Sequence, residues 1–198
     1  PEGTSPAVRA FVEHKLYAGA QPSKYYYNIP CFRYEKPQSG RLREFHQFGI
    51  ETFGTSDMMA DAEIISLAYD FLKEMGITDI ELRINSVGCP ECRKNHRQSL
   101  RTFLEPKYDQ LCDTCKDRFD RNPMRILDCK SPVCHELVQG APVMLDYLCD
   151  DCRDAFEQLK ANLDAMGIEY TVDPGIVRGL DYYTKTAFEF VTTKIGAQ

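Results

Sequence analysis

The chain has 198 residues, 43% of them hydrophobic and 27% charged, and a formal net charge of −6 at pH 7. This balance is typical of a soluble globular protein and excludes a disordered tail. No apolar run is long enough to cross a bilayer, and no export signal is visible at the first residues. We therefore expect a cytoplasmic protein without a membrane partner.

The first predicted elements are a helix and a hairpin. Thr4 predicts a hydroxyl-capped helix start, and Gly19 can end that helix. Residues 24–35 and 45–53 are rich in aromatic and apolar side chains, and a Pro- and Gly-containing loop separates them. The two runs predict antiparallel strands joined by a long basic connection.

A second helix and a third strand follow the hairpin. Asp57 is a suitable N-cap for the helix, and Gly76 is a suitable end. Residues 80–85 then alternate apolar and polar side chains, which predicts a half-buried strand. The apolar residues expected on one side of the helix are Ile64, Leu67, Ala68, Phe71 and Met75.

The character of the sequence changes after the third strand. Residues 88–167 predict mainly helices with cysteine pairs at their ends, whereas residues 168–172 and 182–191 predict strands. This pattern indicates a core in two parts, residues 1–87 and 168–198, with a helical insertion lobe between them.

Charged and polar side chains gather on the predicted hairpin. Arg33 and Glu35 share one face of the first strand, and Gln47 and Glu51 share one face of the second. Buried charges must be paired, so a ligand-binding surface explains this set better than a salt-bridged sheet face. Guanidinium groups suit phosphate oxygens, and carboxylates suit amino groups. The returning end of the loop adds Arg41, Arg43 and Phe45.

A second polar set, Arg-Gly-Leu-Asp-Tyr-Tyr, spans residues 178–183. If this segment is a strand, Tyr182 and Tyr183 face opposite sides of it. The structural alternative is a local pair of Arg178 with Asp181, with both tyrosines in a core.

These sets together resemble the motifs of one enzyme family. Phe-Arg-x-Glu from Phe32, followed by Arg-x-Arg-x-Phe-x-Gln from Arg41, resembles the second signature motif of class II aminoacyl-tRNA synthetases. Residues 178–183 resemble a segment peculiar to histidyl-tRNA synthetases, and residues 1–4 are similar to their amino-acid-binding loop. The resemblance implies an α+β fold: a class II synthetase-like antiparallel sheet flanked by helices, incomplete at both ends, with a mostly helical, cysteine-rich insertion lobe.

The resemblance also implies a ligase that activates histidine with ATP and Mg²⁺ and transfers it to tRNA(His). Arg33 would contact the α-phosphate of ATP and stabilise the charge that develops there. Glu35 would order the adenine loop, and Phe45 would stack on the adenine. Arg41 and Arg43 would reach the outer phosphates.

For the amino acid, the resemblance implies a pocket that recognises the imidazole and the carboxylate. Glu51 and Tyr183 would hydrogen-bond the imidazole, and Arg178 would bridge the histidine carboxylate and the α-phosphate. The catalytic candidates are Arg33, Gln47 and Arg178. The histidine-binding candidates are Glu2, Thr4, Gln47, Glu51, Arg178, Tyr182 and Tyr183.

By the same resemblance, we expect the chain to be part of a longer protein. The family's first motif, which builds the dimer interface, would precede Pro1. Its third motif and its anticodon-binding domain would follow Gln198. We therefore expect a homodimer for the full-length protein and weak activity at most for the chain alone.

Eight of the nine cysteines fall in close pairs, and Cys31 stands alone. Two pairs can supply the four thiolates of a tetrahedral zinc site, so one or two structural zinc ions are expected. Three groupings of the four pairs are possible, and His96 or His135 could replace a thiolate. Free thiols, disulfides and an iron–sulfur cluster are alternatives. The metal-ligand candidates are Cys89, Cys92, Cys112, Cys115, Cys129, Cys134, Cys149 and Cys152.

The charge is uneven along the chain. Residues 93–130 carry ten Lys and Arg against six Asp and Glu, a local balance of +4 that leaves −10 for the rest. This stretch suits the contact with the tRNA acceptor stem that the resemblance implies for the insert, although a solvated helix surface would carry similar charges. Arg118, Arg121 and Arg125 are expected to share a helix face, and charge reversal of the three is expected to weaken tRNA binding without affecting adenylation.

Two other functions fit parts of this pattern. A synthetase-like regulatory subunit of ATP phosphoribosyltransferase would share the fold. A sensor, however, need not keep Arg33, Gln47, Glu51 and residues 178–183. A zinc module that binds nucleic acid without catalysis would explain the cysteines and leave both arginine motifs unexplained. A tRNA-charging assay on the full-length protein would separate the enzyme from the regulatory subunit.

Overall fold

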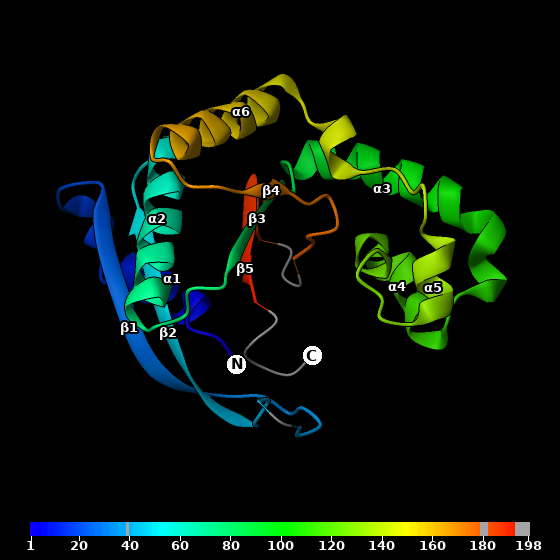
Figure 1. Cartoon of the computed structure of the whole chain (residues 1–198), viewed down its shortest axis with the longest axis horizontal. Helices are drawn as coiled ribbons and strands as arrows, with labels where there is room; N and C mark the ends of the chain where they lie inside the picture. Colours follow the sequence, from blue (N-terminus) through cyan, green and yellow to red (C-terminus); the bar gives the residue numbers. More distant parts are fainter. Residues whose placement is uncertain (39, 179–181, 193–198) are drawn as a thin grey trace. The chain divides into compact units, whose positions relative to one another are not determined.

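A computed structural model describes residues 1–38, 40–178 and 182–192 of the chain (Figure 1). The chain divides into two compact units. The first unit comprises Pro1–Asp79 together with Thr192, and the second comprises Ile80–Val191. The division into residues 1–87, 88–167 and 168–198 stays a prediction.

The first unit contains the predicted helix, hairpin and second helix. Its elements are α1 (Thr4–Glu13), the 3-10 helix η1 (Leu16–Ala18), β1 (Ser23–Phe32), β2 (Glu44–Phe53) and α2 (Met58–Glu74). β1 ends before the predicted Glu35, although the backbone N–H of Arg33 still donates to the carbonyl of Arg43 at 2.8 Å. The antiparallel hairpin that the sequence predicts is confirmed.

The carboxylate of Glu2, which precedes α1, takes the place of the predicted hydroxyl cap. Thr4 is already the first helical residue, and Gly3 is the N-cap. The Glu2 carboxylate accepts the backbone N–H of Thr4 at 2.7 Å, which puts a negative charge at the positive end of the helix. The helix also ends before the predicted Gly19, because Lys15 adopts a left-handed φ of 55°.

The two faces of the hairpin pack against different helices. On one face, Phe53 stacks on Phe11 of α1 with ring centroids 4.1 Å apart. On the other face, Phe48 stacks on Phe71 of α2 at 5.0 Å. Since side chains alternate along a strand, Phe45, Gln47, Gly49 and Glu51 share the face that carries Phe53.

α2 begins at the predicted N-cap, and its predicted apolar side is only partly buried. The Asp57 carboxylate accepts the backbone N–H of Met59 at 2.9 Å. Leu67, Phe71 and Met75 are 43%, 42% and 66% exposed. Phe71 nevertheless stacks on Phe48 of the hairpin, so the predicted side packs without being fully covered. The residues that α2 buries are Met58, Ala62 and Ile65.

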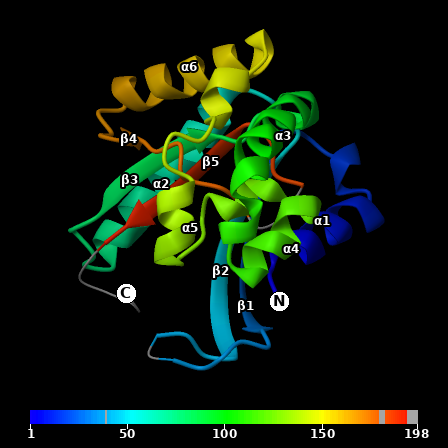
Figure 2. The same ribbon diagram turned by 90° about the vertical axis from the view of Figure 1, so that its right-hand side faces the viewer.

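The second unit contains a three-stranded sheet. β3 (Glu81–Ser86) lies between β4 (Thr171–Val172) and β5 (Thr186–Val191), as Figure 2 shows. β3 is antiparallel to β5 but parallel to β4. The prediction of an antiparallel sheet is therefore correct for β5 and wrong for β4.

Both later strands are shorter than predicted. The backbone N–H of Ile168 donates to the carbonyl of Leu163 at 3.0 Å and closes the preceding helix, so β4 begins later than expected. Lys185 adopts a left-handed φ of 57°, which interrupts the extended chain. As a result, β5 begins after Lys185 and not at Tyr182.

The remainder of the second unit is mainly helical, as predicted. Its core combines Leu100, Leu104 and Ile126 with the buried thiols of Cys92 and Cys115. No helix among the described residues is long and apolar enough to span a bilayer. The helical elements are α3 (Pro90–Leu104), η2 (Glu105–Gln110), α4 (Asp113–Arg121), η3 (Pro123–Ile126), α5 (Pro132–Leu137), η4 (Met144–Tyr147) and α6 (Asp150–Ala165).

Candidate active site and cysteine clusters

The register of the hairpin gathers several predicted site residues on one face. Tyr25 is opposite Glu51, and Ile29 is opposite Gln47. Paired residues point to the same side of an antiparallel ladder, so Gln47 and Glu51 lie on the face that also carries the odd-numbered side chains of β1. The sequence predicts this shared face only if the register of the two strands brings the odd-numbered residues of both to the same side. The observed register does so.

Arg33 extends this face past the end of β1. Its guanidinium carbon lies 4.7 Å from the ring centroid of Phe45. Its Nε donates to the carbonyl oxygen of Pro1 at 2.8 Å. These two contacts orient the guanidinium, and its terminal N–H groups remain available as donors for a ligand.

The loop at residues 1–4 contacts the same face. The backbone N–H of Gly3 donates to Oε1 of Gln47 at 2.8 Å. Partial burial raises the pKa of the Glu2 carboxyl, but hydrogen bonds from Ser5 and Thr4 outweigh burial and hold the pKa below its usual value. Glu2 is therefore anionic at neutral pH, with its carboxylate directed at the start of α1.

Tyr27 lies among the predicted histidine-binding residues, and the sequence analysis missed it. Its hydroxyl lies 3.5 Å from Oγ1 of Thr4 and donates to the Glu51 carboxylate at 3.4 Å. Burial, together with the charges of Glu51 and Glu2, raises the pKa of Tyr27, so the hydroxyl keeps its proton. The available signal was its even spacing from Arg33, which follows the end of β1.

Substituting Gly49 by Ala is expected to lower the free energy of unfolding by about 1–3 kcal/mol. A Cβ at this position would lie 2.1 Å from Cζ of the Tyr27 ring. Chemical denaturation of the full-length protein measures the effect. Adding Gly49→Ala to a Tyr27→Ala background should cost much less, because the ring is then absent. An equal cost in both backgrounds would contradict the close packing of Gly49 and Tyr27.

The predicted phosphate-binding residues meet in the loop that connects β1 to β2. Arg41 Nε lies 2.7 Å from the Glu35 carboxylate, and Arg43 Nε donates to the Glu35 carbonyl at 3.1 Å. The Arg43 guanidinium also lies over the Tyr34 ring, 4.8 Å from its centroid. The Arg41 side chain is 60% exposed, so its ion pair contributes little stability and Arg41 can exchange Glu35 for a phosphate at low cost.

The predicted histidine-specific segment belongs to the second unit, and residues 179–181 lie outside the described residues. Arg178 Nη1 lies 2.8 Å from the Glu189 carboxylate, and its guanidinium is 5.4 Å from the Tyr183 ring centroid. The rings of Tyr182 and Tyr183 stack with centroids 4.9 Å apart. The prediction that they face opposite sides of a strand is wrong, because β5 begins beyond them.

All eight paired cysteines assemble into two clusters in the second unit. In each cluster the four ligand atoms lie within 4.8 Å of one another. The structure thus selects one of the three groupings that the sequence leaves open. The first cluster consists of Cys89, Cys92, Cys149 and Cys152, and the second consists of Cys112, Cys115, Cys129 and Cys134.

Hydrogen bonds stabilise the thiolate form of one cysteine in each cluster, whereas burial raises the pKa of Cys115 and Cys152. The N–H of Cys149 donates to Sγ of Cys92 at 3.1 Å. The N–H of Cys112 donates to Sγ of Cys134 at 3.4 Å, but burial still holds the pKa of Cys134 above its usual value. Burial raises the pKa of the Cys92 thiol, but backbone hydrogen bonds and neighbouring thiols bring it down to about 7. A backbone hydrogen bond is the largest cause that lowers the pKa of Cys112 to about 7.

The sulfur positions fit a tetrahedral metal ion. A zinc–sulfur distance of about 2.3 Å separates the sulfurs of a tetrahedral site by about 3.8 Å. The Cys89 and Cys92 sulfurs are 3.5 Å apart, and those of Cys112 and Cys129 are 3.9 Å apart. Each cluster therefore needs little movement to ligate zinc.

The two histidines considered as substitute ligands lie outside both clusters. His96 Nε2 contacts the carbonyl oxygen of Pro142 at 2.8 Å, and burial lowers the pKa of this imidazole. The His135 ring contacts the side chain of Gln139 at 3.4 Å. The cysteines alone therefore complete both four-ligand sets.

Arg118, Arg121 and Arg125 do not share a helix face as predicted. Arg118 and Arg121 belong to α4, but Arg125 belongs to η3. Arg118 Nη1 donates to the carbonyl oxygen of Arg125 at 2.9 Å, which gives this guanidinium a structural contact. The helix ends because Asn122, which precedes Pro123, leaves the helical region with φ −154°.

The family model described as histidyl-tRNA synthetase matches residues 1–198. The chain belongs to the histidyl-tRNA synthetase family. A relative named histidine–tRNA ligase, from Caldanaerobacter subterraneus subsp. tengcongensis, is 62% identical over 197 residues, which is 100% of this chain and 47% of that protein. The chain thus spans about half the length of the curated histidine–tRNA ligases that it matches.

Solved structures support the class II synthetase fold. A crystal structure of apo S. aureus histidyl-tRNA synthetase aligns with a TM-score of 0.74 and 40% identity over 96% of this chain and 44% of that chain. A structure described as an ATP phosphoribosyltransferase regulatory subunit/histidyl-tRNA synthetase from Bacillus halodurans C aligns with a TM-score of 0.62 over 100% of this chain and 55% of that one. The two sequences are 21% identical, so this likeness shows the fold alone.

Proposed function

We propose that the full-length protein carrying this chain is a histidine–tRNA ligase that uses ATP to join histidine to tRNA(His). One observation carries the proposal beyond family membership. The hairpin register puts Gln47 and Glu51 on the face that Arg33 extends, with the loop at residues 1–4 contacting Gln47. That face offers a guanidinium, an amide and a carboxylate, which are the groups that an adenylate of an amino acid requires.

For ATP, Arg33 would bind the α-phosphate while Phe45 stacks on the adenine. The contact of the Arg33 guanidinium with the Phe45 ring supports this pairing of roles. Arg41 and Arg43 would bind the outer phosphates, and Glu35, which already contacts both, would order the adenine loop. ATP is expected to bind as its Mg²⁺ complex, and the metal would neutralise part of the phosphate charge.

For histidine, we assign the amino and carboxylate groups to Glu2, Thr4 and Gln47. Glu51 would accept a hydrogen bond from the imidazole. The imidazole needs one further partner, and Tyr183 would supply it, with Tyr182 lining the same pocket. The Arg178 guanidinium would exchange its Glu189 partner for the histidine carboxylate and the α-phosphate.

The reaction would proceed in two displacements. A carboxylate oxygen of histidine attacks the α-phosphorus, the bond from that phosphorus to the bridging oxygen breaks, and pyrophosphate leaves. A ribose hydroxyl of the terminal adenosine of tRNA then attacks the carbonyl carbon of the adenylate, and AMP leaves. Arg33 and Arg178 would act by positioning the reactants and by stabilising negative charge on the α-phosphate oxygens.

The full-length protein is expected to catalyse histidine-dependent exchange of pyrophosphate into ATP and to charge tRNA(His). Exchange without added amino acid, and with amino acids other than histidine, serves as the control. A regulatory subunit of ATP phosphoribosyltransferase would give neither activity but would alter the rate of that transferase. Absence of both exchange and charging in folded protein would therefore reject the ligase and favour the alternative.

We further propose that the two cysteine clusters each hold one structural Zn²⁺. Four cysteine sulfurs per cluster, with separations close to the tetrahedral value, support a closed zinc site. The zinc ions would supply folding energy to a lobe with a small apolar core. Free thiols and an iron–sulfur cluster are the alternatives that metal analysis distinguishes.

The family resemblance supports three further proposals about the whole protein. Residues 1–87 and 168–198 would form the two parts of the catalytic core, and residues 88–167 would form the insertion lobe. The full-length protein would act as a homodimer in the cytoplasm. Sedimentation of the full-length protein would test the dimer directly.

A further inference from the structure

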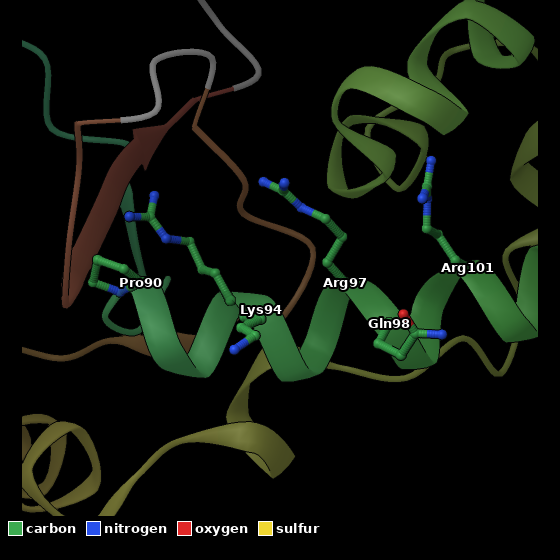
Figure 3. Close-up of a pocket in the computed structure, with 6 residues that line it drawn as sticks. Pro90, Lys94, Arg97, Gln98 and Arg101 are labelled. Atoms are coloured by element: carbon green, nitrogen blue, oxygen red, sulfur yellow. The ribbon is translucent and has the colours of Figure 1, made fainter.

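The side of α3 that carries its arginines forms a basic pocket. Arg93, Arg97 and Arg101 recur at four-residue spacing, which places them about 6 Å apart along the helix axis. They line a pocket of about 360 Å³. Figure 3 shows Arg97 and Arg101 extending from the same side of the helix, and Lys94 pointing away from them. The other residues that line this pocket are Pro90, Lys94 and Gln98.

Some of the cationic side chains in this pocket already have a carboxylate partner. Arg101 is anchored to Asp120 at 2.9 Å, and Lys94 forms an exposed pair with Glu91 at 3.6 Å. Arg97 is exposed and has no ion-pair partner among the described residues. No carboxylate lines the pocket, so an anion entering it meets an uncompensated guanidinium at its centre.

A second pocket connects this side of α3 to the histidine-specific segment. Arg93 and Arg97 line it together with Arg178 and Tyr183. All of these residues belong to the second unit. The basic surface therefore continues from Arg101 past Arg97 to Arg178, which is the residue that the proposed function puts beside the adenylate.

A linear polyanion fits this surface better than a compact ligand. The three arginines lie in a row along one helix and line the same pocket. The chain as a whole is acidic, with a net charge of −6, so only a local row of this kind would attract a polyanion. Guanidinium groups bind phosphate oxygens with two parallel hydrogen bonds.

We infer that Arg93, Arg97 and Arg101 bind the phosphate backbone of the single-stranded 3′ end of tRNA as it enters the site of Arg178 and Tyr183. The inference rests on the proposed function, because that function brings the terminal adenosine to Arg178. It relocates the tRNA contact of the lobe from the trio Arg118, Arg121 and Arg125 to α3.

The test compares Arg97→Glu with Arg121→Glu in the full-length protein. Both variants make the same charge change on an exposed arginine of the same unit, and Arg121 lines neither pocket. Arg97→Glu is expected to raise the Kd for tRNA(His) on the order of tenfold. It should also reduce the slope of log Kd against log salt by about 0.7 for each lost phosphate contact. Arg121→Glu should change the Kd by less than about twofold.

A tRNA that lacks its single-stranded 3′ end locates the contact. Arg97→Glu should weaken binding of intact tRNA but add little to the loss that truncation already causes, because both changes remove the same contact. If Arg97→Glu weakened the binding of intact and truncated tRNA equally, the inference would be overturned, and the duplex stem would be indicated as the contact. Equal effects of Arg97→Glu and Arg121→Glu would overturn it in favour of diffuse attraction.

Histidine-dependent pyrophosphate exchange separates this inference from the proposed function. Exchange needs no tRNA, so the inference predicts that Arg97→Glu leaves the exchange rate nearly unchanged. A fall in the exchange rate as large as the fall in tRNA affinity would mean that Arg97 serves adenylation, and it would overturn the inference. If the wild-type protein showed neither exchange nor charging, the proposed ligase activity would be rejected. The tRNA-binding curves of the variants would still test whether the arginines of α3 bind tRNA. Arg97→Lys, which keeps the charge, should retain most of the salt slope.

Discussion

Replacing Cys115 by Ser is expected to remove one zinc ion per chain and to lower the melting temperature by about 10 °C or more. Cys115 belongs to the second cluster and is fully buried at 0% exposure. A serine hydroxyl is a poor zinc ligand, and the three remaining thiolates would be left without their shared cation. Elemental mass spectrometry on the full-length protein, together with thermal unfolding, measures both effects.

Cys31→Ser is the matched control for this experiment. Cys31 is also buried, at 4% exposure, but it lies outside both clusters. The same substitution there should leave the zinc content unchanged. Identical metal content in wild-type, Cys115→Ser and Cys31→Ser proteins would contradict the zinc proposal. So would a folded wild-type protein that holds no metal and titrates as free thiols.

Replacing Arg178 by Ala in the full-length protein is expected to lower histidine-dependent pyrophosphate exchange by about 10²–10³-fold. The guanidinium would otherwise stabilise charge that develops on the α-phosphate, and Ala offers no donor. The affinity for ATP should fall much less than the rate, because the interaction forms mainly in the transition state. Initial rates at varied ATP and histidine concentrations separate the two effects.

Arg83→Ala provides the control for Arg178→Ala. Arg83 also forms ion pairs in the second unit, with Glu81 at 2.9 Å and Asp173 at 3.3 Å, but it has no predicted role in binding. A similar fall in both variants would show that losing any ion pair of this sheet disturbs activity, and the specific role of Arg178 would be rejected. Arg178→Lys should remain impaired, because an ammonium group cannot make the paired contact of a guanidinium.

The hairpin and the shared face of Gln47 and Glu51 were predictable because local signals agreed there. Period-two spacing put Gln47 and Glu51 on one face, and a Pro- and Gly-containing loop marked the connection between the strands. Tyr27 was missed because an aromatic residue on a strand is more often part of a core than of a site. Its contacts with Thr4 and Glu51 depend on where the first loop crosses the hairpin, which no local pattern encodes.

The predictions that failed depended on where an element stops or on which segments meet. A single left-handed residue, Lys185, moves the start of β5 past the tyrosine pair and lets their rings stack. Asn122 ends α4 and separates Arg125 from Arg118 and Arg121. The grouping of the cysteines was open for a similar reason, because all four pairs have comparable knuckle spacing and only the tertiary fold selects partners.

The two cysteine clusters are nested along the chain. The first cluster joins Cys92 to Cys149 across 57 positions, and the second joins Cys112 to Cys129 across 17 positions inside that span. Closing the longer loop costs about 1 kcal/mol more chain entropy than closing the shorter one. On chain entropy alone, the inner cluster is therefore the easier one to form first. The outer cluster then needs only to bring the starts of α3 and α6 together, where Cys89 and Cys149 precede the helices.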